Sequence, residues 1–482
     1  MRATKTMHAT TATHDNKGYN FNPTILREYD IRGQIGKNLS EDDAYALGLA
    51  FGTYVKREAP LDSRKGTICV GYDGRHSSPS LAAALIKGLR ETGHNVEAVG
   101  LGPSPMLYFA VKDHKADAGI MVTGSHNPSD YNGFKMLLQN APVFGKTIQR
   151  IGEIAAAGDF ESGSFGALEE TNIKGNYVHR LLKDLTGKRP MKVAWDAGNG
   201  AAGAVLKMLC DELPGQHFLL YDDVDGDFPN HHPDPTVDEN LVDLQACVRD
   251  NGCDLGIAFD GDGDRIGVVD EHGNVLRCDI LMTIYARDVL ESFPGASIIG
   301  DVKCSQVMFD EINRLGGNGV MWKTGHSLIK DKMSETGAPL AGELSGHIFF
   351  ADKYYGYDDA LYCAIRLLNA LSDADGALST LTAELPKLFN TPEVRIDVDE
   401  EKKFGLVPQI IENVKNALPA DTTLDDIDGI RISGPDGWWL LRPSNTQDVL
   451  VFRAESDSKD GLERLKNMAL QEVKKLGYSL NF

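Results

Sequence analysis

Residues 67–74 read Thr-Ile-Cys-Val-Gly-Tyr-Asp-Gly, an apolar run that ends in a turn at Asp73-Gly74. A run of this length and composition is typical of a buried strand. Leucines spaced as on one face of a helix follow over residues 81–89, and a second strand pattern covers 95–99. This order of elements predicts a strand, helix and strand unit of an α/β domain.

The same order of patterns occurs twice more along the chain. Strand patterns over 192–198 and 297–301 are each followed by a helical pattern and then by another strand pattern. An aspartate closes the first strand of each unit, at positions 73, 196 and 301. The spacing is too long for a solenoid, whose repeats span roughly 20 to 50 residues. It predicts three tandem α/β domains with mostly parallel sheets.

The pattern changes beyond Pro392. Residues 394–398 alternate like a strand, a helical pattern runs through 406–414, and three short strand patterns precede a final helical pattern over 461–476. Adjacent strands joined by short turns predict an antiparallel sheet and a smaller α+β domain. The expected divisions are a mobile tail (1–20), three α/β domains (21–171, 172–274 and 275–388) and the α+β domain (389–482).

Composition excludes several classes of protein. The 482 residues carry a net charge of −21, which argues against a nucleic-acid partner. The chain has neither an apolar run long enough to span a membrane nor the apolar core of a signal peptide. Its seven cysteines are scattered singly, as in a protein from a reducing compartment. We therefore expect a cytoplasmic protein.

A serine follows the apolar run over residues 116–122, within the stretch Thr123-Gly124-Ser125-His126-Asn127-Pro128. Ligands of open α/β sheets bind beyond the carboxyl ends of strands, so Ser125 suits a nucleophile on a short loop. By itself the stretch also fits an ordinary turn. It does not match a hydrolase elbow, which needs glycine at positions 123 and 127.

A second strand pattern, 256–259, leads into Asp260-Gly261-Asp262-Gly263-Asp264-Arg265. Carboxylates at alternate positions, separated by glycines, can converge on one hard cation such as Mg²⁺. A calcium EF-hand is excluded because Arg265 replaces the glycine of its sharp turn and a strand precedes the loop. A solvated acidic turn is the remaining alternative. Arg265 offers a counter-charge for a bound phosphate.

Residues 198–203 match Gly-x-Gly-x-x-Gly, with Asp222 and Asp223 near the distance expected for a ribose contact. This pattern gives a competing hypothesis, a nicotinamide-dependent oxidoreductase. A tight structural turn explains it equally well, because the sister units lack the glycines. The sequence has no Walker phosphate loop, which argues against ATP.

Three further segments gather polar side chains. Residues 342–347 read Gly-Glu-Leu-Ser-Gly-His and are suited to sugar hydroxyls, while 442–447 read Arg-Pro-Ser-Asn-Thr-Gln and offer donors for a phosphate. Tyr29-Asp30-Ile31-Arg32-Gly33 places Arg32 in a turn that could face a cleft. Each segment alone also fits an ordinary surface loop.

In this order the segments resemble the α-D-phosphohexomutase family, and specifically its bacterial phosphomannomutase/phosphoglucomutase branch. The likeness runs from Tyr29 to Arg453 and rests on five motifs: Tyr-Asp-Ile-Arg-Gly, Thr-Gly-Ser-His-Asn-Pro, Asp-Gly-Asp-Gly-Asp-Arg, Gly-Glu-Leu-Ser-Gly-His and Arg-x-Ser-Asn-Thr. It implies four domains around a central cleft. Gln447-Asp448 departs from the family, many of whose members have a residue followed by proline after the threonine.

The resemblance assigns roles residue by residue. It implies a phosphoserine at Ser125 and a Mg²⁺ held by Asp260, Asp262 and Asp264, with Ser125 as a further ligand and Arg265 supporting the phosphate. It implies that Lys135 and His347 act as general acid and general base, with Arg32 and His126 close by. Glu343 and Ser345 would bind sugar hydroxyls. The other phosphate would be held by Arg442, Ser444, Asn445 and Thr446, with Tyr29, Lys303, His326 and Arg453.

The implied reaction interconverts hexose 1-phosphate and hexose 6-phosphate, of mannose and/or glucose, through a bound hexose 1,6-bisphosphate. A phosphoglucosamine mutase is the alternative within the family, and a non-catalytic sugar-phosphate binder is a further alternative outside it. The expected partners are small hexose phosphates, with no nucleic acid and no membrane. We expect a monomer or a homodimer.

Overall fold

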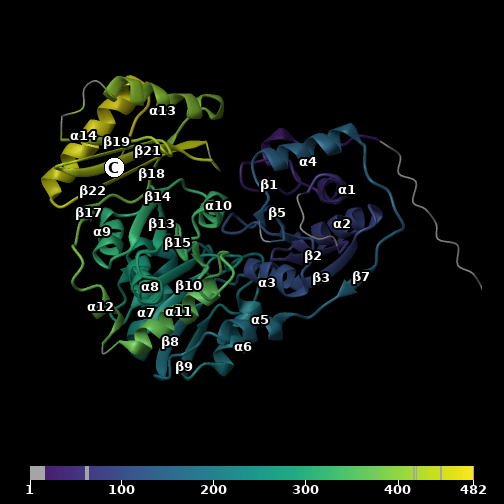
Figure 1. Cartoon of the computed structure of the whole chain (residues 1–482), viewed down its shortest axis with the longest axis horizontal. Coiled ribbons are helices and arrows are strands. Elements are labelled where there is room, and N and C mark those ends of the chain that lie inside the picture. The colour runs from purple at the N-terminus through teal and green to yellow at the C-terminus, as the bar shows by residue number, and fades with distance from the viewer. Residues whose placement is uncertain are drawn as a thin grey trace, which may run out of the picture. The chain divides into compact units, whose positions relative to one another are not determined.

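The computed structural model describes residues 17–59, 65–139, 141–374, 376–415, 418, 421–445 and 448–480. The chain forms two compact units, whose helices and strands are labelled in Figure 1. One unit comprises Met1–Leu276 with Ser345–Leu378, and the other comprises Arg277–Leu344 with Ser379–Phe482. The boundaries of these two units differ from those of the four predicted domains. The predicted domain boundaries therefore stay a prediction. Most of the predicted tail lies outside the described residues.

The first unit begins with a mixed sheet in the order β1-β5-β4-β2-β3-β7, to which β6 adds beside β5. Strands β4, β2, β3 and β7 are parallel, whereas β5 runs antiparallel to both β4 and β1. The strands are β1 (Ile31–Gln34), β2 (Thr67–Tyr72), β3 (Asn95–Leu101), β4 (Ala118–Val122), β5 (Tyr131–Leu138), β6 (Ala141–Pro142) and β7 (Leu168–Glu170).

Helices cover both faces of this sheet (Figure 1). One apolar core joins α1, α2 and α4 to the strands, while α3 packs on β2 and β4 outside that core. A capping box of Ser40 and Asp43 starts α1, and Gly158 ends α4 in the left-handed conformation. These helices are α1 (Glu41–Arg57), α2 (Ser78–Glu91), α3 (Ser104–His114) and α4 (Lys146–Ala157).

A second sheet of the first unit has the order β12-β11-β10-β8-β9. Strands β10, β8 and β9 are parallel, and β11 returns antiparallel to β10. Its elements are α5 (Lys174–Leu182), β8 (Met191–Asp196), α6 (Gly203–Glu212), β9 (Gly215–Leu220), α7 (Val242–Asn251), β10 (Leu255–Phe259), β11 (Ile266–Asp270) and β12 (Val275–Leu276). The later segment of this unit adds β16 (Ile348–Phe350) and α11 (Ala360–Asp373).

The second unit contains the third α/β sheet. Strand β13 pairs in parallel with β14 on one side and with β15 on the other. The elements are α8 (Cys278–Ser292), β13 (Ser297–Asp301), α9 (Gln306–Arg314), β14 (Asn318–Trp322), α10 (His326–Thr336) and β15 (Leu340–Gly342). The side chain of Ser305 caps α9 by accepting a hydrogen bond from the amide of Val307.

The last sheet is antiparallel, in the order β17-β22-β21-β20-β19 with β18 also beside β22. Two helices share an apolar core with it. The elements are β17 (Phe389–Asn390), β18 (Val394–Asp397), α13 (Glu400–Lys415), β19 (Thr423–Asp425), β20 (Ile430–Gly434), β21 (Gly437–Pro443), β22 (Val449–Ser456) and α14 (Lys459–Lys475). The predicted fold class, three mixed α/β sheets and a smaller α+β domain, is confirmed.

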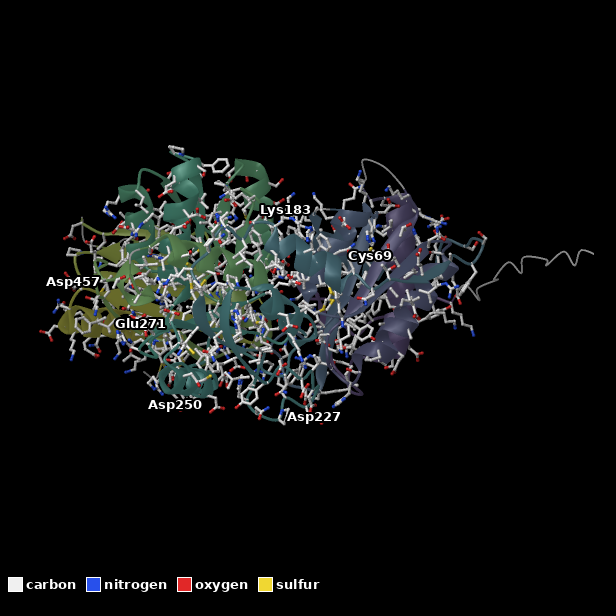
Figure 2. The ribbon with its side chains drawn as sticks, turned by 90° about the horizontal axis from the view of Figure 1, so that it is seen from below. Cys69, Lys183, Asp227, Asp250, Glu271 and Asp457 are labelled. Carbon is white, nitrogen blue, oxygen red and sulfur yellow. The ribbon has the colours of Figure 1, made fainter. Side chains whose placement is uncertain are left out.

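Several acidic side chains lie at the surface, whereas most of the cysteines are buried. Asp227, Asp250 and Asp457 are exposed at the surface, whereas the labelled Cys69 is buried (Figure 2). All seven cysteines are free thiols. Among the described residues, we find no helix with the length and apolar character needed to cross a membrane.

Candidate active site

Ser125 lies in the loop that joins β4 to the antiparallel strand β5, called here the Ser125 loop (residues 123–130). The side chain is buried, and the backbone has the left-handed φ of 50°, which is uncommon for a residue with a Cβ. The amide of Ser125 donates to Thr123 Oγ1 at 2.8 Å, and Thr123 Oγ1 is 2.8 Å from Asp73 Oδ2. These contacts hold the serine in its unusual conformation.

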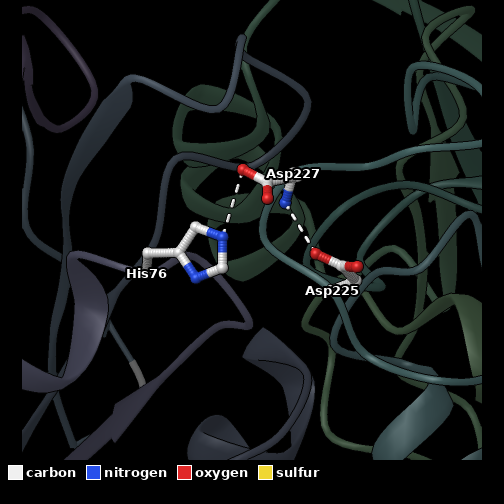
Figure 3. A group of neighbouring side chains, drawn as sticks. All are labelled: His76, Asp225 and Asp227. Carbon is white, nitrogen blue, oxygen red and sulfur yellow. Dashed lines mark hydrogen bonds and ion pairs between the residues drawn. The ribbon is translucent and has the colours of Figure 1, made fainter.

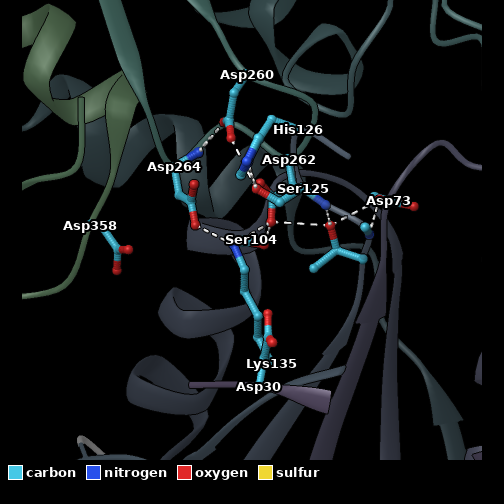
Figure 4. Close-up of polar contacts among 12 residues, drawn as sticks. Asp30, Asp73, Ser104, Ser125, His126, Lys135, Asp260, Asp262, Asp264 and Asp358 are labelled. Atoms are coloured by element: carbon cyan, nitrogen blue, oxygen red, sulfur yellow. Dashed lines mark hydrogen bonds and ion pairs between the residues drawn. The ribbon is translucent and has the colours of Figure 1, made fainter. Parts of the chain in front are cut away.

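Three aspartates lie in the hairpin between β10 and β11, called here the aspartate loop (residues 260–265). Asp260, Asp262 and Asp264 are fully buried, and one carboxylate oxygen from each lies within 4.8 Å of the others. Ser125 Oγ donates to Asp260 Oδ2 at 3.2 Å (Figure 4). The structure therefore brings the serine and the three aspartates to one point.

The carboxylate group is suited to a cation. Burial, together with repulsion from Asp264 and Asp262, raises the pKa of Asp260 well above its ordinary value. Asp262 Oδ1 and Asp264 Oδ1 are buried and accept no hydrogen bond within the part of the chain that the structure describes. Buried oxygens without a donor are costly, and three such acidic groups fit a hard divalent ion.

Two features allow the loops to approach each other. A Cβ at Gly261 would lie 2.3 Å from the carbonyl oxygen of Ser125, so a glycine is needed there. Ser104, at the start of α3, donates its hydroxyl to Asp262 Oδ2 at 2.5 Å, and its amide donates to the Asp262 carbonyl oxygen at 2.8 Å. The helix N-terminus and the glycine thus fix the aspartate loop beside the Ser125 loop.

Comparison with known families covers most of the chain. Models of the phosphoglucomutase/phosphomannomutase family match it with alpha/beta/alpha domain I at residues 23–162, domain II at 175–273, domain III at 277–389 and the C-terminal domain at 393–472. The chain belongs to this family. The resemblance seen in the sequence is thereby confirmed, and with it the expectation of a mutase.

Individual relatives span nearly the same length. The phosphomannomutase/phosphoglucomutase of Pseudomonas aeruginosa is 43% identical over 95% of this chain and 97% of its own. A phosphoglucomutase of Neisseria meningitidis is 42% identical over 92% and 95%. A phosphoglucomutase/phosphomannomutase family structure from Burkholderia thailandensis has a TM-score of 0.88, 41% identity and coverage of 96% and 100%.

Lys135 contacts two of the three aspartates. It lies on β5, and its Nζ donates to Asp262 Oδ2 at 2.7 Å and to Asp264 Oδ2 at 2.5 Å (Figure 4). Burial acts to lower the pKa of Lys135, but the two carboxylates outweigh it and hold the pKa well above its ordinary value. The ammonium group therefore stays charged beside the acidic cluster.

His347 reaches the same site from the segment that precedes β16. Its Nε2 accepts a hydrogen bond from Arg265 Nε at 2.9 Å, so the ring proton lies on Nδ1. Nδ1 is 3.0 Å from Asp358 Oδ2 and 3.6 Å from Asp264 Oδ1. Arg265 also lies 3.8 Å from Asp260 Oδ2. The structure thus joins His347 and Arg265 to the aspartate loop.

His126 and Arg32 also belong to this neighbourhood. His126 Nδ1 is 3.1 Å from Ser125 Oγ. Burial, with the nearby cations Arg265 and Arg32, lowers the pKa of His126 well below its ordinary value, so its ring is neutral. Arg32, on β1, pairs with Asp30. Tyr29 is buried in the same unit.

The phosphate-binding candidates of the second unit are held by acidic partners. Lys303 Nζ is 2.7 Å from Glu393 Oε1, and Arg442 Nε donates to Asp428 Oδ2 at 2.9 Å. Arg453 donates to the carbonyl oxygen of Lys303 and lies 3.5 Å from Asp279 Oδ2. Against the effect of burial, Lys303 lowers the pKa of Glu393 to about 2. Ser444 is buried, Asn445 is half-buried, and Thr446 lies outside the described residues.

The Gly-Glu-Leu-Ser-Gly-His segment crosses the division between the two units. Glu343 is buried in the second unit, where its Oε1 accepts from the amide of Gly325 at 2.5 Å. His326, at the start of α10, follows that glycine. Ser345 is half-buried and belongs to the first unit with His347.

Sequence reasoning missed four residues that hold this site. Asp73, Thr123, Ser104 and Asp358 contact the Ser125 loop, the aspartate loop or His347 through hydrogen bonds or ion pairs. For Asp73 a signal was present, because aspartate closes the first strand of each predicted repeat. Strands β2 and β4 are parallel neighbours, so their carboxyl ends place Asp73 beside the Ser125 loop.

The glycine-rich turn at 198–203 has a structural explanation. A Cβ at Gly203 would lie 2.1 Å from the carbonyl oxygen of Asp222, and one at Gly200 would lie 2.9 Å from that of Gly261. The amide of Ala201 donates to the Gly261 carbonyl oxygen at 2.9 Å. The turn supports the aspartate loop, and family membership favours this explanation over the oxidoreductase hypothesis.

We expect Gly261→Ala to separate the two loops. The new methyl group would collide with the Ser125 carbonyl oxygen, at 2.3 Å. Mutase turnover should fall at least about tenfold, and the free energy of unfolding should fall by about 1–3 kcal/mol. Steady-state kinetics and chemical denaturation measure these effects.

Gly175→Ala is the matched control, because a Cβ at Gly175 meets nothing within 4 Å. Gly175 lies in α5, so its replacement by alanine should not lower the free energy of unfolding and can raise it by up to about 1 kcal/mol. Equal behaviour of the two variants would contradict the close-approach explanation.

Proposed function

We propose that this chain interconverts hexose 1-phosphate and hexose 6-phosphate, of mannose and/or glucose, through a phosphoserine at Ser125. The observation that carries the proposal is the 3.2 Å contact between Ser125 Oγ and Asp260 Oδ2, within a cluster of three buried carboxylates. Phosphoryl transfer depends mainly on alignment and neutralisation of charge. A hydroxyl beside a cation site and flanked by cationic side chains meets both needs.

We propose Mg²⁺ as the ion, with Asp260, Asp262 and Asp264 as ligands and an oxygen of the modified Ser125 as another. The all-oxygen, anionic donor set and the two buried oxygens without a donor support this choice. When bound, Mg²⁺ neutralises charge that develops on the transferred phosphoryl group. Arg265 supports the same phosphate from the end of the aspartate loop.

The side chains around Ser125 would donate and accept the protons that phosphoryl transfer requires. Lys135 carries a positive charge near the transferring group, and His347 and Lys135 act as acid and base toward the substrate hydroxyl. His126, whose ring is neutral, and Arg32 orient the reacting groups. The phosphoryl group passes from the phosphoserine at Ser125 to the free hydroxyl of a bound hexose phosphate, whose proton goes to the base, and this gives hexose 1,6-bisphosphate. The bisphosphate then turns around, its other phosphoryl group passes back to Ser125 Oγ, and the sugar oxygen that it leaves takes up a proton from the acid.

The remaining predicted residues would bind the rest of the substrate. We assign the sugar hydroxyls to Glu343 and Ser345. We assign the phosphate that is not transferred to Arg442, Ser444, Asn445 and Thr446, with Tyr29, Lys303, His326 and Arg453. In the second unit, Lys303 and Arg442 are paired with Glu393 and Asp428, and a phosphate would compete with these carboxylates for them.

We further propose that the protein works in the cytoplasm as a monomer or homodimer, on small hexose phosphates alone. The seven free cysteines support a reducing compartment. The net charge of −21 supports the absence of a nucleic-acid partner.

A direct assay tests the proposed function. We expect the purified chain, given Mg²⁺ and a trace of hexose 1,6-bisphosphate, to convert glucose 1-phosphate and mannose 1-phosphate to their 6-phosphates. Glucosamine 1-phosphate, measured in parallel, distinguishes the phosphoglucosamine mutase alternative. Hexose phosphate binding without conversion of any of the three sugars would identify a non-catalytic binder and overturn the proposal.

A further inference from the structure

Arg75 has no part in the reaction outlined above, yet it is among the most completely buried large side chains of the protein. It follows β2, in the turn that Asp73 begins. An arginine offers five N–H donors in a fixed plane. The Nε donor of Arg75 goes to Asp73 Oδ2 at 3.2 Å, and the other four go to backbone carbonyl oxygens. All five N–H donors of the guanidinium therefore have acceptors inside the protein.

The four carbonyl oxygens belong to the Ser125 loop and to the residue that follows it. One terminal nitrogen donates to Ser125 at 2.7 Å and to Asn127 at 2.6 Å. The other donates to Pro128 and, at 3.1 Å, to Tyr131. Carbonyl groups that point inward toward one cation fix the path of the backbone from the serine to the start of β5.

The loop over residues 222–231 covers Arg75. The Phe228 ring centroid lies 5.2 Å from Arg75 Cζ, within range of a cation–π contact. This loop also approaches the Arg75 turn closely, because a Cβ at Gly226 would lie 2.8 Å from the Gly74 carbonyl oxygen. On the exposed side, His76 Nε2 is 3.1 Å from Asp227 Oδ1, and the amide of Asp227 donates to Asp225 (Figure 3). Phe228 is therefore held over the guanidinium.

We propose that Arg75, covered by Phe228, is a positioning residue that holds the Ser125 loop in the conformation needed for phosphoryl transfer. The inference rests on the proposed function at Ser125. Arg75 adds a second support, beside Thr123, for the left-handed backbone of that serine, because the guanidinium binds the carbonyl oxygen of Ser125 itself. Arg75 acts through the backbone and touches no reacting atom.

The chemistry of the contact requires arginine. A lysine ammonium has three donors on one atom, so it cannot reach four carbonyl oxygens and Asp73 together. Arg75→Lys keeps the charge and removes the planar fork, which makes it the variant that isolates positioning. Gly124 supports the same geometry, because a Cβ there would lie 2.4 Å from Arg75 Nε.

The chain offers a matched control pair away from the site. Arg90, on α2, donates from Nε to the Gly166 carbonyl oxygen at 2.8 Å, and its Cζ lies 4.1 Å from the Phe165 ring centroid. Arg90→Lys replaces an arginine by a lysine, and Phe165→Leu replaces an aromatic ring by an aliphatic side chain. Both changes lie outside the Ser125 loop, so they serve as controls for the same changes made at Arg75 and Phe228. The test variants are Arg75→Lys and Phe228→Leu.

Kinetics of the Mg²⁺-loaded full chain give the first measurement. We expect Arg75→Lys to lower kcat by about 10- to 100-fold, because small misplacements of a reacting group cost that much. The KM for hexose phosphate should stay within about threefold. Phe228→Leu should lower kcat several-fold in the same manner, and the control pair should match the wild type.

Hydrogen exchange gives a second measurement that does not depend on activity. Amides of residues 124–131 should exchange at least about tenfold faster in Arg75→Lys, with the rest of the first unit unchanged. A folded Arg75→Lys with wild-type kcat and wild-type exchange would overturn the proposal. If that variant does not fold, wild-type kcat and exchange in Phe228→Leu would overturn it. A wild-type chain without mutase activity would instead refute the proposed function, and the exchange measurement would still test the role of Arg75 in holding the loop.

Discussion

Ser125→Ala should abolish mutase turnover. The substitution removes the Oγ that lies 3.2 Å from Asp260 Oδ2 and that would accept the phosphoryl group. Loss of a covalent nucleophile leaves no alternative route through the same site, so kcat should fall at least about 10⁴-fold. Binding of hexose 6-phosphate, measured by calorimetry, should change little because the residues proposed to bind the sugar and the phosphate that is not transferred remain.

Two further measurements make this prediction specific. Wild-type protein treated with hexose 1,6-bisphosphate should carry one phosphate on the peptide that contains Ser125, and the variant should carry none. Ser80→Ala is the control, since Ser80 is an exposed serine of α2 whose hydroxyl donates to Glu41. Substantial turnover in Ser125→Ala would show that Ser125 is not the residue that carries the phosphoryl group, whatever the effect on binding.

The fold was largely predictable from local pattern. Each strand, helix and strand unit begins with a short apolar run, and the runs over 67–74, 192–198 and 297–301 became β2, β8 and β13. Buried parallel strands read as continuous apolar segments, which makes them visible in sequence. The antiparallel partners of these sheets, such as β5 and β11, were less visible because their pairing depends on tertiary packing.

The candidate site was only partly predictable. Ser125 and the three aspartates stand out because glycines flank them and strands precede them. Ser104 does not, because it is far from Asp262 in sequence and only the fold brings the two together. Asp358 is near His347 in sequence, but no motif marks it as the partner of that ring. Arg75 could not be recognised either, since four of its five N–H donors go to backbone carbonyl groups, which leave no trace in a sequence.

The two loops have the same place in the topology of their sheets. The Ser125 loop and the aspartate loop each join a buried parallel strand to an antiparallel neighbour, β4 to β5 and β10 to β11. Such a hairpin returns the chain at once, so the loop stays short and its side chains stay at the carboxyl end of the sheet. Glycines at 124 and 261 then allow close approach to Arg75 and to Ser125.

Asp264→Asn should lower turnover and weaken binding of the proposed Mg²⁺. Asp264 is fully buried, with one oxygen beside Lys135 Nζ and the other without a hydrogen bond among the described residues. The amide keeps the shape of the side chain but removes one carboxylate charge from the proposed set of Mg²⁺ ligands. We expect kcat to fall by about 10²- to 10³-fold, and the Mg²⁺ concentration for half-maximal activity to rise.

Asp196→Asn provides the matched control for this effect. Asp196 is also fully buried at the end of a parallel strand, but it accepts from the Gly198 amide and contacts His231 instead of joining the three-aspartate cluster. The control should lose about 1–3 kcal/mol of stability while its Mg²⁺ dependence stays that of the wild type. Calorimetric titration with Mg²⁺ separates the two variants directly, because only Asp264→Asn should lose affinity for the ion. An unchanged Mg²⁺ isotherm in Asp264→Asn would show that the ion binds elsewhere, since a buried ligand cannot lose its charge without cost to a divalent cation.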